Sequence, residues 1–198
     1  QRIGIDHQES FEELRDFVGT VAEGGCHVFI VHARKAWLEG LSPKQNREIP
    51  PLNYEWVYAL KEQFPHLTIV LNGGIQSLEE CEQHLTKVDG VMLGRAAYQT
   101  PWLLSTVDSR LFGAEDPALT RESVIVKLSA YVDDYLANGG RLNHVTRHIL
   151  GLFHQQPGGR LFRRALSEGA HLIDADGKVL LAALAEVTQR HGKESVVE

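Results

Sequence analysis

Several classes of protein are excluded by what this sequence contains little of. Its 198 residues include only two cysteines, Cys26 and Cys81, which make no disulfide framework and have no metal-ligand spacing. No stretch approaches the roughly 20 apolar residues of a membrane-spanning helix. Residues 1–6 contain no initiator methionine and no apolar segment typical of a signal peptide. We therefore expect a cytoplasmic protein with no metal and no membrane partner.

Acidic residues are absent from one long window, residues 135–167, although the chain carries a formal net charge of −6. The negative charge of the whole chain argues mildly against a polyanionic partner. The acid-free window, by contrast, is a local basic patch. Arg160, Arg163 and Arg164 are spaced to share one helical face, and no acid lies within reach in sequence to neutralise them. Guanidinium groups suit phosphates, and the alternative is a solvated charged face. The rest of the patch consists of Arg141, His144, Arg147, His148 and His154.

Strand and helix patterns alternate through the first half of the chain. Residues 28–31, 68–71 and 90–93 read as strands, and residues 1–5 as the tail of another. Residues 28–31 form a continuous apolar run, typical of a parallel strand covered on both faces. Ser10, Asn53 and Ser77 are expected to cap the intervening helices, and a further helix is expected near residues 98–107. The alternation predicts a parallel sheet with right-handed crossovers.

Four such units are too few to close a barrel of eight strands. They form either a small open sheet or the second half of a (β/α)8 TIM barrel, and the abrupt start favours the half barrel. After residue 113 the pattern changes to helices alone, expected at residues 120–137, 142–154, 158–170 and 177–190. The predicted class is therefore α/β, with half a barrel in residues 1–113 and an all-helical C-terminal domain in residues 114–198.

Two successive strands each run into a glycine-containing loop that precedes a helix. The first ends in Asn72, Gly73 and Gly74, and the second in Gly94 and Arg95. A glycine turn at the start of a helix exposes backbone N–H groups to an anion. One such loop alone is usually only a turn, but the ordered pair is typical of the phosphate site after strands 7 and 8 of a barrel.

A third candidate region begins at His32, directly after the predicted strand 28–31. An imidazole at the carboxyl end of a barrel strand points to a ligand-facing role, although a lone histidine is often structural. The connection that follows runs to residue 52, and long ordered loops tend to be functional. Its Lys44, Arg47 and Trp37 suit a nucleic-acid backbone and stacked bases; the alternative is a solvated loop with a packed tryptophan.

Six stretches of the sequence closely resemble one enzyme family, the A-type bacterial tRNA-dihydrouridine synthases. They read RIGID at 2–6, IVHARKAW at 30–37, GLSPKQNREIPPL at 40–52, NGGI at 72–75, GRAAY at 94–98 and TRHILGLF at 146–153. The resemblance runs nearly end to end. It implies a TIM barrel followed by a helical tRNA-binding domain. It also implies reduction of tRNA uridines to 5,6-dihydrouridine by FMN, with NADPH as the reductant.

The same resemblance implies roles for particular residues. His32 is similar to the family's flavin-contacting histidine, and Asn72, Gly73, Gly74, Gly94 and Arg95 resemble its FMN phosphate loops. The residues that resemble its tRNA-contacting cations are Lys44, Arg47, Arg160 and Arg163. The family's catalytic cysteine lies in an Asn-x-x-Cys-Pro motif, and neither cysteine here has that context.

This departure indicates a C-terminal fragment that contains no catalytic residue and is inactive alone, and we expect it to be a monomer. Two alternatives stay open: a barrel enzyme acting on a small phosphorylated substrate, which does not explain the basic helices, and a non-catalytic RNA-binding module.

Overall fold

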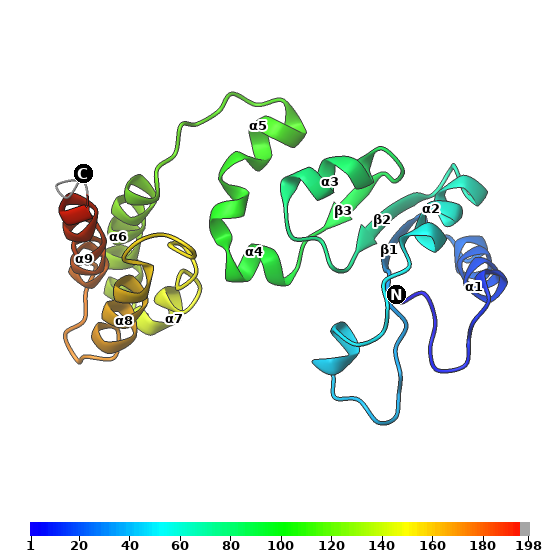
Figure 1. Ribbon diagram of the computed structural model, residues 1–198, viewed down its shortest axis with the longest axis horizontal. Helices are drawn as coiled ribbons and strands as arrows, with labels where there is room; N and C mark the ends of the chain where they lie inside the picture. Colours follow the sequence, from blue (N-terminus) through cyan, green and yellow to red (C-terminus); the bar gives the residue numbers. More distant parts are fainter. Residues whose placement is uncertain (195–198) are drawn as a thin grey trace. The chain divides into compact units, whose positions relative to one another are not determined.

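The chain folds into two compact units, Gln1–Gly94 and Arg95–Glu198 (Figure 1). The computed structural model describes residues 1–194, with side chains described up to residue 188. No helix within this described part is long and apolar enough to cross a membrane.

The first unit is an α/β structure built on a parallel sheet. Its elements are α1 (Phe11–Glu23), β1 (Val28–His32), the 3₁₀ helix η1 (Gln45–Arg47), α2 (Tyr54–Gln63), β2 (Thr68–Asn72), α3 (Leu78–Leu85) and β3 (Gly90–Met92). The strands pair in the order β1-β2-β3, all parallel. Residues 1–5 extend the sheet beside β1, since the His32 N–H donates to the Gln1 carbonyl and the Ile3 N–H to the His32 carbonyl. The predicted alternation is confirmed, whereas residues 1–5 make isolated parallel bridges at Arg2 and Ile5 and not a full strand.

The three predicted helix caps are present. The Ser10 and Ser77 hydroxyls and the Asn53 side chain each accept the N–H of the residue three positions on, which satisfies a donor that the first helical turn leaves without an intrahelical partner. At α1 the Glu13 carboxylate also accepts the Ser10 N–H and completes a capping box. These caps fix where each helix begins after its strand.

One face of the sheet is covered and the other is open within this unit. Phe29 and Val31 of β1 are buried, and so are Ile69 and Leu71 of β2, on the face against which the helices pack. The intervening Val28 is 57% exposed and Ile30 44% exposed. The expectation that this strand is covered on both faces is therefore wrong for the described structure, because no described element of the unit packs on the second face.

An ion pair ties the amino ends of β2 and β3 to α2. The Lys61 ammonium lies 2.8 Å from the Asp89 carboxylate and also donates to the Pro65 and Leu67 carbonyls. The Asp89 carboxylate also accepts a hydrogen bond from the Ile69 N–H, at 2.8 Å. Partial burial alone would raise the pKa of Asp89, but the bonds from Lys61 and from the Ile69 N–H lower it below its ordinary value.

We expect Asp89→Asn to lower the free energy of unfolding by about 1 kcal/mol, because an amide loses the charge-assisted bonds. A lowered carboxyl pKa stabilises the fold above the unfolded-state value, and this contribution disappears as the pH falls through the folded-state value. Urea denaturation at neutral pH should therefore give the variant a lower free energy of unfolding than the wild type. This difference in free energy should disappear in strong acid. Equal stability at neutral pH would contradict the assignment.

The second unit is helical. It contains α4 (Arg95–Gln99), the 3₁₀ helix η2 (Pro101–Thr106), α5 (Val107–Phe112), α6 (Arg121–Ala137), α7 (Leu142–Thr146), α8 (Gly159–Gly169) and α9 (Lys178–Glu194). Its core joins α6, α8 and α9 through Ile125, Val132, Phe162, Leu166 and Leu180. The Gly177 N–H donates to the Asp133 carboxylate, and the Ser129 hydroxyl donates to the Gly177 carbonyl, which anchors the start of α9 on α6.

By contacts the chain divides after Gly94, earlier than the domain boundary expected at residue 113. The guanidinium of Arg121 lies 4.4 Å from the centre of the Trp102 ring and donates to the Leu152 carbonyl, so η2 packs with the helical elements. The helix expected near residues 98–107 is interrupted at Pro101, whose ring cannot continue an α-helix.

The predicted helix 142–154 is also shorter than expected, since α7 ends at Thr146. Beyond it the chain makes successive tight turns, with bonds from the Ile149 N–H to the Thr146 carbonyl and from the Leu152 N–H to the Ile149 carbonyl. Gly151 backs directly onto the carbonyl of Gln99, where any side chain would collide. Tertiary packing therefore overrides the helical pattern.

Candidate functional site

Two of the predicted site residues lie side by side at the carboxyl ends of β1 and β2. His32 is the last residue of β1 and pairs in register with Asn72, the last residue of β2. Asn72 in turn pairs with Met92 at the end of β3, and its Nδ2 donates to Met92 Sδ at 3.4 Å. The register of the sheet thus brings an imidazole and a carboxamide to the same edge.

The turn after β2 requires glycine at two consecutive positions. Gly73 and Gly74 have φ of 113° and 79°, in the region that favours glycine. A methyl group on Gly73 would lie 3.2 Å from His32 Cε1, so the imidazole rests against this turn. A methyl group on Gly74 would lie 2.7 Å from the Tyr54 hydroxyl oxygen. The structure therefore places His32 of β1 against the Asn72–Gly73–Gly74 segment at the end of β2.

The Gly73–Gly74 turn is held by a tyrosine that the sequence alone did not point to as a site residue. The Tyr54 hydroxyl donates to the Gly73 carbonyl at 2.9 Å. Further along, the Gln76 N–H donates to the Glu80 carboxylate at 2.7 Å, just before Ser77 caps α3. The predicted cap at Asn53 puts Tyr54 in the first turn of a helix, but nothing in the sequence indicates that the Tyr54 hydroxyl reaches Gly73.

The second glycine loop has different constraints. Gly94 is exposed and follows β3 by two residues, and a Cβ on it would meet no atom of the described residues within 4 Å. The fold itself therefore gives no reason for glycine at this position. Arg95 comes next and begins α4, the first element of the second unit.

The long loop after β1 has a built internal structure. Arg2 donates through Nη1 to the carbonyls of Lys35 and Asn46, at 2.7 and 2.9 Å. The Asn46 side chain accepts the Trp37 N–H and donates to the Trp37 carbonyl. These contacts pin both limbs of the loop, so the side chains it displays are held by a defined backbone.

Lys44 and Arg47 lie on the exposed side of this loop. Arg34, near its start, donates to the carbonyls of Glu48 and Pro50. Burial lowers the pKa of Arg2, and the charges of Arg47 and Arg34 lower it further. The loop therefore concentrates positive charge, which suits an anionic partner.

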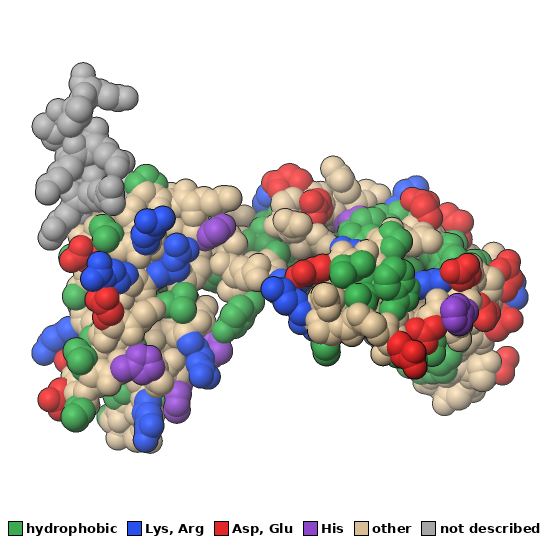
Figure 2. Space-filling view, turned by 60° about the horizontal axis from the view of Figure 1, so that its bottom comes forward, with side chains coloured by type: hydrophobic (Ala, Val, Ile, Leu, Met, Phe, Trp, Pro, Cys, Tyr) green, Lys and Arg blue, Asp and Glu red, His purple; other side chains and the backbone are tan. Residues whose placement is uncertain are grey.

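The predicted arginine face lies on α8, but one of its three members is neutralised. Arg160, Arg163 and Arg164 are all exposed. Arg164 pairs with Glu168 at 2.8 Å, one helical turn on and one residue beyond the acid-free window. The expectation that no acid was within reach is therefore wrong for Arg164. Arg160 and Arg163 have no ion-pair partner in the part of the chain that the structure describes. Figure 2 shows Lys, Arg and His side chains over one face of the helical unit.

His144 and His148 of the basic patch do not share one helix, although both fall within the helix expected at residues 142–154. His144 lies in α7, whereas Arg147 caps its end and His148 follows in the turns. The His148 ring contacts the Tyr98 ring edge-on, with 5.7 Å between the ring centres. This region is therefore a cationic surface of mixed backbone geometry.

Neither cysteine reaches the carboxyl ends of the strands. Cys26 precedes β1 at its amino end, where the Sγ–H donates to the Val28 carbonyl at 3.4 Å. Cys81 is fully buried within α3. Among the described residues, no group of three or more metal-ligating side chains is assembled.

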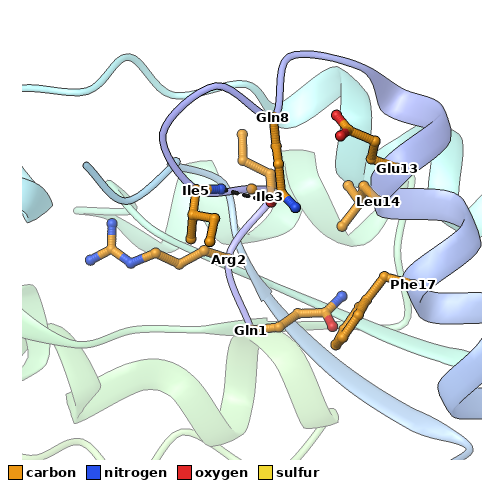
Figure 3. Close-up of a pocket in the computed structure, with 9 residues that line it drawn as sticks. Gln1, Arg2, Ile3, Ile5, Gln8, Glu13, Leu14 and Phe17 are labelled. Carbon is orange, nitrogen blue, oxygen red and sulfur yellow. Dashed lines mark hydrogen bonds between the residues drawn. The ribbon is translucent and has the colours of Figure 1, made fainter. Parts of the chain in front are cut away.

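An open pocket of about 310 Å³ lies between residues 1–5 and α1 (Figure 3). Apolar side chains such as Ile3, Leu14 and Phe17 line it, together with Gln8, whose amide oxygen accepts the Ile5 N–H. None of the predicted site residues lines this pocket, so it is separate from the glycine turn.

Comparison with known proteins identifies a family for nearly the whole chain. Residues 1–189 match the dihydrouridine synthase family. A relative from Vibrio vulnificus (strain CMCP6), a tRNA-dihydrouridine(20/20a) synthase, is 54% identical over 189 residues, which cover 95% of this chain and 58% of the relative. A protein of the same name from Escherichia coli (strain K12) is 54% identical over 190 residues, covering 96% of this chain and 55% of the relative. The chain thus spans little more than half the length of these curated relatives.

Proposed function

Because the chain belongs to the dihydrouridine synthase family, we propose that the full-length protein reduces tRNA uridines to 5,6-dihydrouridine. The positions we propose are 20 and 20a, which the names of its relatives give. The observation that carries the proposal in this chain is the placement of His32 against the Gly73–Gly74 turn, beside Asn72. We further propose FMN as the cofactor and NADPH as its reductant.

The proposed fold is the second half of a (β/α)8 barrel followed by a helical tRNA-binding domain. A parallel sheet with helices against one face supports it, because a barrel covers its strands with helices only on the outside. In this proposal the exposed Val28 and Ile30 face the barrel interior, which the remaining strands would enclose. Residues 1–113 would form the barrel half and residues 114–198 the helical domain, with Trp102 of η2 packed against the helical core.

The residues present fit the phosphate of FMN. Two consecutive glycines with positive φ form a turn before a capped helix, and Gly94 leaves space that the fold does not fill. In the proposal Asn72, Gly73, Gly74, Gly94 and Arg95 hold the flavin's phosphate end, and His32 contacts the flavin. The bound cofactor would supply hydride transfer to the uracil ring. The protein residues here bind and orient the cofactor.

We propose that Lys44, Arg47, Arg160 and Arg163 contact tRNA phosphates. All four are exposed, and the loop carrying Lys44 and Arg47 is pinned by Arg2, so its cations are presented on a fixed backbone. Phosphate contacts of this kind position an RNA without reading its sequence.

The proton that accompanies hydride addition to the uracil ring requires a positioned general acid. Cys26 at the amino end of β1 and Cys81 buried in α3 are both badly placed for that role. We therefore propose that this chain contributes cofactor and RNA contacts, that it contains no catalytic acid, and that it is inactive by itself.

Two measurements on the purified full-length protein separate this proposal from its alternatives. Flavin absorbance and release of FMN on denaturation are expected, and a protein without flavin would contradict the proposal. A gel shift with tRNA is expected as well; a flavoprotein without tRNA binding would favour a barrel enzyme acting on a small phosphorylated substrate. Binding of tRNA without flavin would favour an RNA-binding module.

A further inference from the structure

A chain of aromatic contacts leads from a buried histidine to the Gly73–Gly74 turn. The Tyr58 hydroxyl and His84 Nδ1 are 2.6 Å apart. The His84 ring meets the Tyr54 ring edge-on, with 4.6 Å between centres. The Tyr54 hydroxyl then reaches the Gly73 carbonyl at 2.9 Å. Since His84 is only 9% exposed, this chain rests on a side chain with little freedom to move.

The ionisation of these groups favours a fixed donor at the turn. Burial raises the pKa of Tyr54, and the negative charge of Glu80 raises it further. Burial lowers the pKa of His84. At neutral pH the phenol therefore keeps its proton and donates it to the Gly73 carbonyl, while the imidazole beside it is uncharged.

Holding the Gly73 carbonyl also fixes the neighbouring N–H. In a trans peptide the C=O of one residue and the N–H of the next point in opposite directions, and the chain contains no cis peptide among its described residues. With the carbonyl drawn toward Tyr54, the Gly74 N–H points away from it. Within the described part of the chain, no protein atom accepts a hydrogen bond from this N–H. A peptide between two glycines otherwise rotates easily, because neither residue has a Cβ to restrict it.

We propose that Tyr54 is a positioning residue for the phosphate site: its hydroxyl sets the plane of the Gly73–Gly74 peptide so that the Gly74 N–H is directed at the FMN phosphate. The proposal rests on the proposed function and deepens it. A preorganised donor binds more tightly because the ligand does not have to order it.

The test compares FMN with riboflavin, which has the same ring system and no phosphate. Apoprotein prepared from the full-length protein is titrated with each flavin, and binding is followed by flavin fluorescence. We expect Tyr54→Phe to weaken FMN binding about tenfold, the effect of losing one well-placed hydrogen bond. Its affinity for riboflavin should stay at the wild-type value.

Tyr58→Phe is the matched control, since it removes one hydroxyl from the same helix and from a contact with the same histidine, but not from the turn. It leaves the Tyr54 hydroxyl on the Gly73 carbonyl, so it should weaken FMN binding far less than Tyr54→Phe does. Equal weakening of FMN and riboflavin by Tyr54→Phe, or unchanged FMN affinity, would overturn the inference while leaving the proposed function intact. Wild-type protein that binds neither flavin would overturn the proposed function and the inference with it.

Discussion

Gly94→Val should abolish retention of FMN by the full-length protein while leaving its fold intact. Within the part of the chain that the structure describes, a Cβ at this position meets nothing within 4 Å, so these residues do not resist the added side chain. If the backbone of Gly94 lies against the phosphate, the valine side chain occupies the space that the phosphate needs. Gly74 is a poorer test of the cofactor, because substitution there also collides with Tyr54 and strains the backbone.

The measurement is the FMN content of the purified variant, together with its thermal unfolding in the absence of flavin. Gly19→Ala is the control, since the added carbon at that position in α1 makes only an ordinary contact with the Phe64 ring at 3.6 Å. We expect the control to purify with full FMN. Flavin at wild-type stoichiometry in Gly94→Val would remove this loop from the cofactor site.

Replacing both Arg160 and Arg163 with alanine should weaken tRNA binding without loss of FMN. Both side chains are exposed on α8, whereas the helix is anchored by the buried Phe162 and Leu166, so the fold should persist. Each lost phosphate contact should reduce the slope of log K against log salt by roughly 0.7–0.9, through fewer released counterions. The double variant should therefore show a slope shallower by roughly 1.4–1.8.

A salt titration of tRNA affinity measures this slope directly. Arg164→Ala provides a comparison on the same helix, and its effect should be smaller because that guanidinium is already paired with Glu168. If the double variant matches wild type in both affinity and slope, Arg160 and Arg163 are a solvated face and α8 does not bind the RNA.

Local signals predicted the parts of the fold that local interactions decide. The caps at Ser10, Asn53 and Ser77 depend on a side chain and a backbone N–H three residues on, so the sequence places them correctly. The helix expected at 142–154 was predicted too long: α7 ends at Thr146, and the chain beyond it makes successive turns in which Gly151 backs onto the Gln99 carbonyl, a long-range contact that the local pattern does not reveal. The expectation that β1 is covered on both faces was also wrong, because an apolar run in the sequence does not reveal which elements pack on the strand.

The candidate site divides in the same way. Strand ends and glycines pointed to His32, Asn72 and Gly73, and the sheet register then placed them together. Tyr54 was missed, because a tyrosine in the first turn of a helix has many ordinary uses and only the folded chain brings its hydroxyl to Gly73. The Arg164–Glu168 pair was missed because the acid lies one residue outside the window that suggested the patch.

The central proposal is tested most directly by the mass of tRNA after reaction. Unmodified tRNA is incubated with the purified full-length protein, FMN and NADPH, and its fragments are then weighed by mass spectrometry. The account predicts that fragments containing the target uridines gain the mass of two hydrogen atoms, and that no gain occurs without NADPH. Unchanged masses, from a protein that demonstrably holds FMN and binds the tRNA, would contradict it.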